Sequence, residues 1–300
     1  MRRGTQGGAA SSPTRKILLT GKNGQVGWEL ERTLATLGEV VAVDRQGMDL
    51  ADPDSIRRAV RAIRPDLIVN PAAYTAVDKA ESEPQLAMAI NGIAPGIMAQ
   101  EAKLLGAAMV HYSTDYVFDG TKDSPYLEED LPNPLGVYGR TKLAGEEAIR
   151  ASGVPHLILR TSWVYGMRGR NFLLTILRLA KERDELKIVA DQIGAPTWSR
   201  MIAEASAQIL ARHGTNLSDV SGLYHLSAGG QTSWHGFTQA ILDHARSGEQ
   251  ALPRVIPITT PEYPLPAPRP LYSLLSNDKL LKTFDIGLPS WDASLALCVT

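Results

Sequence analysis

Short apolar runs alternate with longer segments of helical periodicity through the first half of the chain. The runs predict β-strands at residues 16–20, 40–43, 67–70, 107–112 and 155–160. Between them, apolar residues recur every three or four positions and predict helices near residues 25–37, 53–63, 84–105 and 136–151. This alternation is typical of an α/β fold in which helices cover both faces of a Rossmann-like, doubly wound parallel sheet.

The pattern becomes irregular after about Tyr165. It predicts helices near residues 171–183, 199–212 and 235–247, and the prolines between Pro261 and Pro270 exclude a regular helix there. We interpret residues 165–300 mainly as a smaller C-terminal α+β lobe, with some segments returning to the first domain, residues 15–164. Residues 1–14 are polar and small, and we expect them to form a disordered leader.

Glycines occupy the turn between the first predicted strand and the first predicted helix. Gly21, Gly24 and Gly27 surround Gln25 and Val26 at this turn. Glycine lets the backbone approach a phosphate, and a helix N-terminus offers free N–H groups and a positive dipole. The turn therefore predicts a dinucleotide pyrophosphate site. Because these glycines fall three apart, unlike the pattern G-x-G-x-x-G, a tight turn that only packs helix on sheet is the alternative.

Asp44 strengthens the prediction of a dinucleotide site. It ends the second predicted strand about twenty residues after Gly24, where an acid can accept hydrogen bonds from ribose hydroxyls. Residues 15–164 are thus predicted to be an NAD(P)-binding Rossmann domain, with residues 165–300 as the substrate-binding lobe.

Tyr138 and Lys142 lie four residues apart in the predicted helix 136–151, so their side chains share one face. A phenol has an ordinary pKa of about 10, and a nearby cation favours its charged form. The pair could act as a proton donor and its tuning group. The same spacing is also common on an ordinary helix surface. Strand 107–112 leads directly into Thr114 and Asp115, at the strand end where open α/β sheets bind ligands.

Composition narrows the classes of function. The formal net charge is −1 and the basic residues are dispersed, which argues against nucleic acid as the main partner. The single Cys298 excludes a disulfide within the chain and a thiolate metal cluster, and it fits a reducing cytoplasm. No stretch approaches the roughly twenty apolar residues of a membrane span. We expect a cytoplasmic enzyme without a membrane or nucleic-acid partner.

Several longer strings carry a family resemblance. They occupy residues 24–30, 75–81, 111–118, 160–165 and 191–197. Together with Thr114 and the Tyr138-x-x-x-Lys142 pair, they resemble the extended short-chain dehydrogenase/reductase family, and within it the dTDP-4-dehydrorhamnose reductases. The match runs from about Lys16 to about Trp291.

The resemblance implies reduction of the C4 ketone of dTDP-4-dehydro-β-L-rhamnose by NADPH or NADH. This is the final step of dTDP-L-rhamnose biosynthesis for surface polysaccharide such as O antigen and lipopolysaccharide. Tyr138 would protonate the C4 oxygen, Lys142 would hold the ribose and lower the phenol pKa, and Thr114 would hydrogen-bond the same oxygen. Asp115 and Trp163 would contact the sugar.

The resemblance also implies a set of cofactor contacts: Gly21, Gly24, Gln25, Val26 and Gly27 at the pyrophosphate turn, Asp44 at the adenosine ribose, Asp49 and Leu50 at the adenine, Ala73, Tyr74 and Thr75 on the nicotinamide side, Tyr112 close by, and Tyr138 with Lys142. Each residue has a plainer alternative. Thr114 could merely end a strand, Trp163 could be core, and Asp49 could belong to a turn.

Three positions depart from the family pattern. Pro71 stiffens the loop after Asn70, and Leu274 stands where an arginine is common. Some relatives dimerise through magnesium held by glutamates; Glu29 is present, but Arg200 replaces the expected second acid. A cation there opposes a divalent metal, so we assign no metal site, regard Mg²⁺ as doubtful, and expect a monomer or homodimer.

Other functions stay open from the sequence. An epimerase or dehydratase acting on a sugar nucleotide would share the fold, although a dehydratase needs an acidic pair and Tyr116 follows Asp115. A non-catalytic regulatory subunit would keep the nucleotide site without turnover. Asp44 favours NADH, whereas the adjacent Arg45 could pair with the 2′-phosphate of NADPH, so both cofactors are expected to bind.

Overall fold

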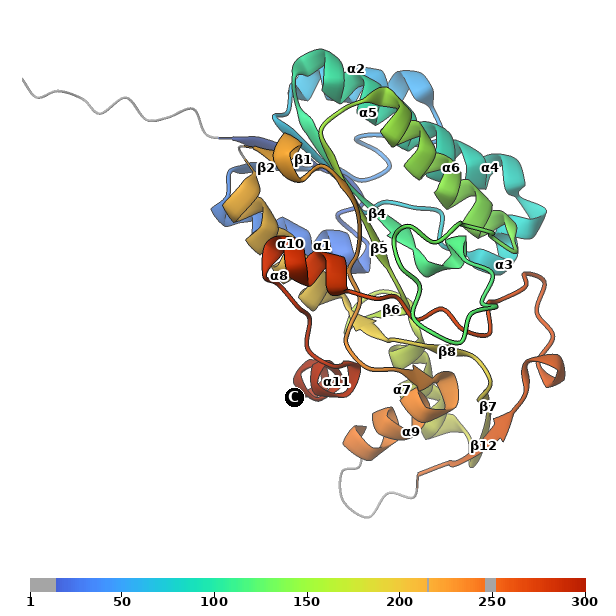
Figure 1. The fold of residues 1–300 in the computed structure, drawn as a ribbon. Coiled ribbons are helices and arrows are strands. Elements are labelled where there is room, and N and C mark those ends of the chain that lie inside the picture. Colours follow the sequence, from blue (N-terminus) through green and yellow to red (C-terminus); the bar gives the residue numbers. More distant parts are fainter. Residues whose placement is uncertain (1–14, 215, 246–251) are drawn as a thin grey trace, which may run out of the picture.

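The computed structural model describes residues 15–214, 216–245 and 252–300. Its central sheet has six strands, all parallel, in the order β10-β5-β4-β3-β1-β2 (Figure 1). The strands are β1 (Lys16–Leu19), β2 (Glu39–Ala42), β3 (Leu67–Asn70), β4 (Ala108–Thr114), β5 (His156–Thr161) and β10 (Gly222–His225). The predicted fold class is confirmed.

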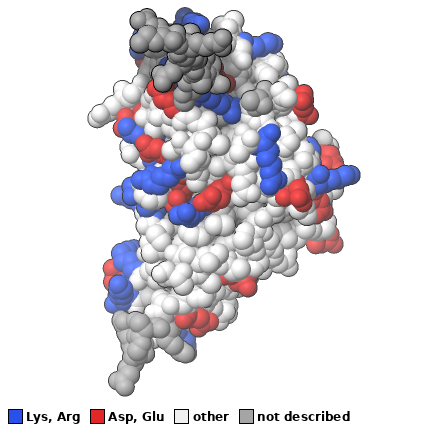
Figure 2. All heavy atoms as spheres, turned by 90° about the vertical axis from the view of Figure 1, so that its left-hand side faces the viewer, with Lys and Arg blue, Asp and Glu red and all other residues white. Residues whose placement is uncertain are grey.

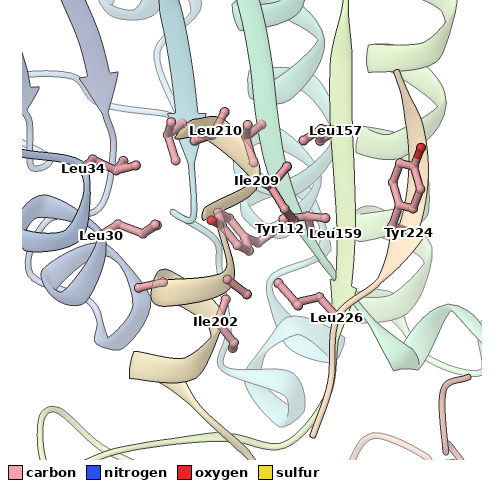
Figure 3. Close-up of a cluster of buried hydrophobic side chains, with 14 of the residues drawn as sticks. Leu30, Leu34, Tyr112, Leu157, Leu159, Ile202, Ile209, Leu210, Tyr224 and Leu226 are labelled. Carbon is pink, nitrogen blue, oxygen red and sulfur yellow. The ribbon is translucent and has the colours of Figure 1, made fainter. Parts of the chain in front are cut away.

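Helices cover both faces of the sheet (Figure 1). On one face lie α2 (Pro53–Ile63), α4 (Pro84–Met88), α5 (Ala94–Leu105) and α6 (Val137–Ser152); on the other lie α1 (Gln25–Thr33), α8 (Ser199–His213) and α10 (Asp278–Phe284). The second face buries Leu30 of α1, isoleucines of α8 and the ring of Tyr112 in one apolar cluster (Figure 3). Each large apolar side chain buried in this way stabilises the fold by about 1.5–3 kcal/mol.

The direction of the chain reverses between β1 and β3. From β1 the chain passes through α1 to β2 on one side, and from β2 through α2 to β3 on the other side of β1. Ligands of open α/β sheets bind at the carboxyl ends of the strands at such a point. The turn of Gly21 follows β1 here, and its Cα lies against Ala72, which follows β3.

The second lobe is built from short paired strands and three helices. Its strand pairs are β6 (Val164–Tyr165) with β9 (Thr197–Trp198), β7 (Glu185–Val189) with β12 (Arg254–Ile258), and β8 (Ile193–Gly194) with β11 (Thr232–Ser233). The helices are α7 (Phe172–Glu182), α9 (Trp234–Ala245) and α11 (Trp291–Val299), which enclose a separate apolar cluster. Cys298 is buried in that cluster, as a small apolar residue would be.

Some boundaries differ from the sequence prediction. The predicted helix 84–105 is interrupted by a π-turn, η2 (Ala89–Ile93), and the predicted helix 25–37 ends as a 3₁₀ turn, η1 (Leu34–Thr36). Sequence patterning missed α3 (Val77–Ser82), α10 and α11. The predicted leader, residues 1–14, lies outside the described residues.

Several elements of the C-terminal half pack with the first domain. β10 pairs with β5 at the sheet edge, and α8 packs on α1. The division of the chain at residue 164 stays a prediction. Among the described residues, no helix combines the length and apolarity that a membrane crossing requires.

A buried ion pair joins α6 to β5. Arg160 donates two hydrogen bonds to Glu146, from Nε at 2.9 Å and from Nη2 at 2.7 Å, and both side chains are 2% exposed. The Arg160 guanidinium also lies 5.0 Å from the centre of the Phe118 ring. Removing one partner of such a pair leaves an uncompensated charge in the core.

We therefore expect Glu146→Leu to lower the free energy of unfolding by about 3–5 kcal/mol. The double variant Glu146→Leu/Arg160→Met should recover much of that loss because no buried charge is left. Urea unfolding measures both. Glu182→Leu, which breaks the exposed Arg178–Glu182 pair, is the control and should cost less than about 1 kcal/mol. If Glu146→Leu and Glu182→Leu lowered the free energy of unfolding equally, the prediction would be wrong.

Candidate active site

Thr114 lies at the carboxyl end of β4, where it is both the last strand residue and the cap of the short helix η3 (Asp115–Val117). Its Oγ1 accepts a hydrogen bond from the Tyr116 N–H at 3.1 Å and donates to Asp115 Oδ1 at 3.1 Å. The local capping alternative is therefore correct. The same geometry holds the hydroxyl at the sheet edge, 5% exposed.

Tyr138 lies in the first turn of α6, and its hydroxyl lies near that of Thr114, which acts on its pKa. Burial raises the phenol pKa to about 12, which the contact with Thr114 partly offsets. The Tyr116 ring packs edge-on against the Tyr138 ring, with 5.8 Å between centroids. The phenol therefore holds its proton at neutral pH, as an acid must before it donates.

Lys142 is 1% exposed and faces β4 rather than the phenol. Its Nζ donates to the Tyr112 carbonyl at 2.6 Å and lies 3.1 Å from His111 Nε2. Burial lowers its pKa to about 8, and the carboxylate of Glu146 opposes that shift. The family resemblance implies that Lys142 lowers the pKa of Tyr138. In this structure the pKa of Tyr138 is raised instead, because burial outweighs every other effect on it.

The glycine turn forms a closely packed cradle at the start of α1. Gly21 has φ +60°, and a Cβ on Gly27 would collide with the Gly21 carbonyl. Gly24 begins the helix, and no side chain caps it. The Gln25 side chain turns toward the second lobe, where it donates to the Val164 carbonyl and accepts from Asn171. The free backbone N–H groups at the start of α1 and the absence of Cβ atoms on the glycines fit a pyrophosphate.

Asp44 follows β2 and is held in place by several donors. It accepts hydrogen bonds from the Gln46 and Gly47 N–H groups and pairs with Lys22 at 3.4 Å. The hydrogen bond from Gly47 is the largest cause of its lowered pKa. A cation thus stands beside the carboxylate that was assigned to the ribose.

Asp49 and Leu50 form a turn beyond Asp44. Asp49 accepts from the Ala51 N–H at 2.9 Å and pairs with the exposed Arg45 at 3.3 Å. Leu50 packs on the core cluster next to α2. The turn alternative for Asp49 is correct, and adenine contact stays a prediction for both residues.

The loop of Ala73, Tyr74 and Thr75 is held by Asn91, which sequence reasoning missed. The Asn91 side chain accepts from the Tyr74 N–H at 2.8 Å and donates to the Tyr74 carbonyl at 3.1 Å. Asn91 is 1% exposed and lies in the π-turn η2. A polar residue in an otherwise apolar helix must find partners, and that was the available signal.

Asp115 and Trp163 are the two residues that the sequence assigns to the sugar. Asp115 is 2% exposed, burial raises its pKa to about 7, and its Oδ2 has no hydrogen-bond partner in the described residues. Trp163 has φ +46° and stacks on Trp234 at 3.6 Å between centroids. A non-glycine residue with positive φ stores backbone strain, which is common at functional sites. Sequence reasoning also missed Trp234.

The structure places Tyr112 differently from the other assigned residues. Its ring packs in the apolar cluster of Figure 3 and its hydroxyl donates to Ser206 at 2.7 Å. Only its carbonyl reaches Lys142. Any cofactor contact by Tyr112 would therefore involve backbone rather than the ring.

The positions that depart from the family pattern are accommodated. Pro71 directly follows β3, where no further strand N–H is required. The Leu274 carbonyl accepts from the Tyr126 N–H at 2.8 Å, so this residue pairs with backbone. Arg200 pairs with Glu204 at 3.3 Å and its charge acts on Glu29. Among the described residues, no group of three or more His, Cys, Asp and Glu side chains could hold a metal.

Charges of both signs are interspersed on the face shown in Figure 2. Basic and acidic side chains alternate across it, and no continuous basic surface is visible there. Nucleic-acid binding depends on such a surface.

Comparison with known proteins identifies the family. The RmlD substrate binding domain family matches residues 15–300. A dTDP-4-dehydrorhamnose reductase of Burkholderia thailandensis is 52% identical over 95% of this chain and 98% of its own length. This chain belongs to the dTDP-4-dehydrorhamnose reductase family. The corresponding family member of Salmonella typhimurium is 48% identical over 95% of this chain and 97% of its own.

A solved structure supports the same assignment. The dTDP-4-dehydrorhamnose reductase of Bacillus anthracis, determined in complex with NADP, is 36% identical. It superposes with a TM-score of 0.87 over 96% of this chain and 99% of its own. The family resemblance predicted from the sequence strings is confirmed.

If Tyr138 is the acid, Tyr138→Phe should lower kcat by on the order of 10² to 10⁴ while leaving cofactor affinity nearly unchanged, because the ring is retained and only the donor is lost. Steady-state kinetics and a cofactor titration measure the two effects. Tyr263→Phe, at a tyrosine 53% exposed, is the control and should behave as wild type. A Tyr138→Phe enzyme with near-normal turnover would remove Tyr138 from this role.

Proposed function

We propose that this protein reduces the C4 ketone of dTDP-4-dehydro-β-L-rhamnose to dTDP-β-L-rhamnose with NADPH or NADH. One observation carries the proposal: the hydroxyls of Tyr138 and Thr114 meet at the carboxyl end of β4, with the Lys142 ammonium buried one helical turn away. Each hydroxyl can rotate to donate to a single carbonyl oxygen, Thr114 by turning away from Asp115 Oδ1, and Tyr138 can also supply the proton.

When bound, NADPH or NADH would supply the hydride that reaches the C4 carbon. The Thr114 and Tyr138 hydroxyls bind the carbonyl oxygen and draw electron density toward it. As the C4–H bond forms, the C–O π bond breaks and the oxygen takes the Tyr138 proton. The resulting phenolate forms one helical turn from the Lys142 ammonium, and solvent must return a proton before the next turnover.

Two side chains favour a sugar as the substrate. The indole of Trp163, supported from behind by Trp234, offers a flat apolar face of the kind that packs on a sugar ring. Asp115 directly follows Thr114, and we propose that its carboxylate accepts from a sugar hydroxyl. Tyr116 follows Asp115 where a dehydratase needs a second acid, so the site favours reduction over dehydration.

Both cofactors are part of the proposal. The Asp44 carboxylate can accept from a 2′-hydroxyl, while Lys22 beside it and the neighbouring Arg45 can pair with a 2′-phosphate. The Bacillus anthracis relative holds NADP. We propose NADPH and NADH as alternative reductants.

The wider setting follows from the reaction. The product would be a rhamnosyl donor for surface polysaccharide such as O antigen. We propose a cytoplasmic monomer or homodimer that needs no metal bridge, a view supported by the cation of Arg200 next to Glu29. The residues named for pyrophosphate, adenine and nicotinamide stay predictions.

Asp44→Ala should raise the ratio of kcat/KM for NADPH over that for NADH. The change removes an acceptor for the 2′-hydroxyl and frees Lys22, now 3.4 Å away, for the 2′-phosphate. Initial rates with each cofactor give the ratio. Asp54→Ala, at an exposed acid of α2, is the matched control and should leave it unchanged. An unchanged ratio in Asp44→Ala would place the ribose elsewhere.

The substrate is tested with purified protein, dTDP-4-dehydro-6-deoxyglucose, and the epimerase that converts this compound to dTDP-4-dehydro-β-L-rhamnose. We expect oxidation of NADPH only when the epimerase is present, with dTDP-rhamnose as product by mass spectrometry. Oxidation that is equal without the epimerase would indicate another keto-sugar. Cofactor binding without any oxidation would indicate a regulatory subunit.

A further inference from the structure

His111 is a fully buried histidine that the proposed reaction does not use. It lies within β4 at 0% exposure, with one ring nitrogen toward α6 and the other toward β3. Its Nε2 is 3.1 Å from Lys142 Nζ, and its Nδ1 is 3.0 Å from the side-chain amide of Asn70. Asn70 is in turn 2.6 Å from Thr20 Oγ1, next to the glycine turn. These four polar side chains form one continuous buried row.

The chemistry of the row selects one tautomer of His111. An ammonium group has three donors and no acceptor, so Nε2 must present its lone pair to Lys142. Nδ1 then carries the proton and donates to Asn70. In the structure Asn70 Nδ2 faces His111 and Asn70 Oδ1 accepts from Thr20 Oγ1. The two ends of an amide occupy nearly the same space, and a proton on Nδ1 requires the opposite orientation, with the Asn70 oxygen facing His111 and its nitrogen donating to Thr20 Oγ1. Every contact in the row then has one donor and one acceptor.

His111 is also fixed in its neutral form. Burial and the charge of Lys142 hold its pKa well below the usual value. A buried imidazolium facing an ammonium would have no stabilising partner. The neutral form leaves His111 Nε2 able to accept from Lys142.

We propose that His111 is a positioning residue for Lys142. Together with the Tyr112 carbonyl, it occupies two of the three N–H groups of the ammonium and leaves the third for the nicotinamide ribose. The ammonium is thereby oriented before the cofactor arrives, so the Lys142 side chain loses less conformational entropy when the cofactor binds. This inference rests on the proposed function, because it assigns the remaining N–H to that cofactor.

The groups that face Lys142 set the expected effect of removing His111. From β4 these are His111 and the Tyr112 carbonyl, and from α6 it is Glu146, which is paired with Arg160 of β5. Loss of one acceptor disfavours the charged form of the amine, so its pKa should fall. The basic limb of the pH profile should then move to lower pH, and the ribose should bind less tightly.

The test compares His111→Leu with His111→Gln, whose side-chain oxygen can replace Nε2 as an acceptor. His111→Leu should lower kcat/KM for NADPH by on the order of 10- to 100-fold at neutral pH, weaken NADPH binding, and shift the basic limb to lower pH. His111→Gln should restore most of the kcat/KM, most of the NADPH affinity and most of the position of the basic limb. His156→Leu, at a histidine that begins β5 at the opposite end of the sheet, should leave all three unchanged.

Two outcomes of the kinetic test would overturn the proposal. One is a folded His111→Leu protein with unchanged NADPH affinity and basic limb. The other is an equal loss of kcat at every pH with unchanged NADPH affinity, which would mean that His111 only fills space.

A second measurement needs no turnover. ¹⁵N NMR of the wild-type histidines, with His111 assigned by comparison with His111→Gln, should show a neutral ring protonated at Nδ1. An Nε2-protonated ring or an imidazolium at neutral pH would overturn the proposal. Because NMR and NADPH titration require no substrate, absence of turnover in the wild type would count against the proposed function alone.

Discussion

The burial of the Lys142 ammonium between α6 and β4 is the constraint on which the rest of the site depends. Moving a charge out of water costs free energy. Acceptors from β4 and a carboxylate one turn along α6 offset this cost for Lys142. That carboxylate is itself buried and requires Arg160 from β5. Charges of alternating sign thus run from the site into the sheet, and the position of α6 is fixed by electrostatics as well as by packing.

The sheet could be predicted well from the sequence because buried parallel strands appear as short apolar runs. β1 to β5 all lie within two residues of their predicted ranges. The second lobe could not be predicted in the same detail. Its strands β6, β8, β9 and β11 have two residues each, too few to show any periodicity, and they form only because distant segments meet.

The candidate site shows the same division. Tyr138 and Lys142 share a helix face and Thr114 ends a strand, so local patterns were sufficient to find them. The direction of the Lys142 side chain was not predictable, because it depends on His111, thirty-one residues earlier. Asn91, His111 and Trp234 act through long-range partners. The signal that could have found the first two is a polar residue inside an apolar element, since such groups must be satisfied.

The π-turn η2 has a consequence for how this helix tolerates insertion and deletion. A π-turn is a helix carrying one extra residue, at the expense of regular hydrogen bonding. Deleting a residue there would restore an ordinary α-helix but rotate everything on one side of it by about 100°. Asn91 would then turn away from the Tyr74 backbone, and the close approach of Gly145 to the Asn91 carbonyl would be lost. In this segment the geometry constrains the number of residues, independently of which residues fill it.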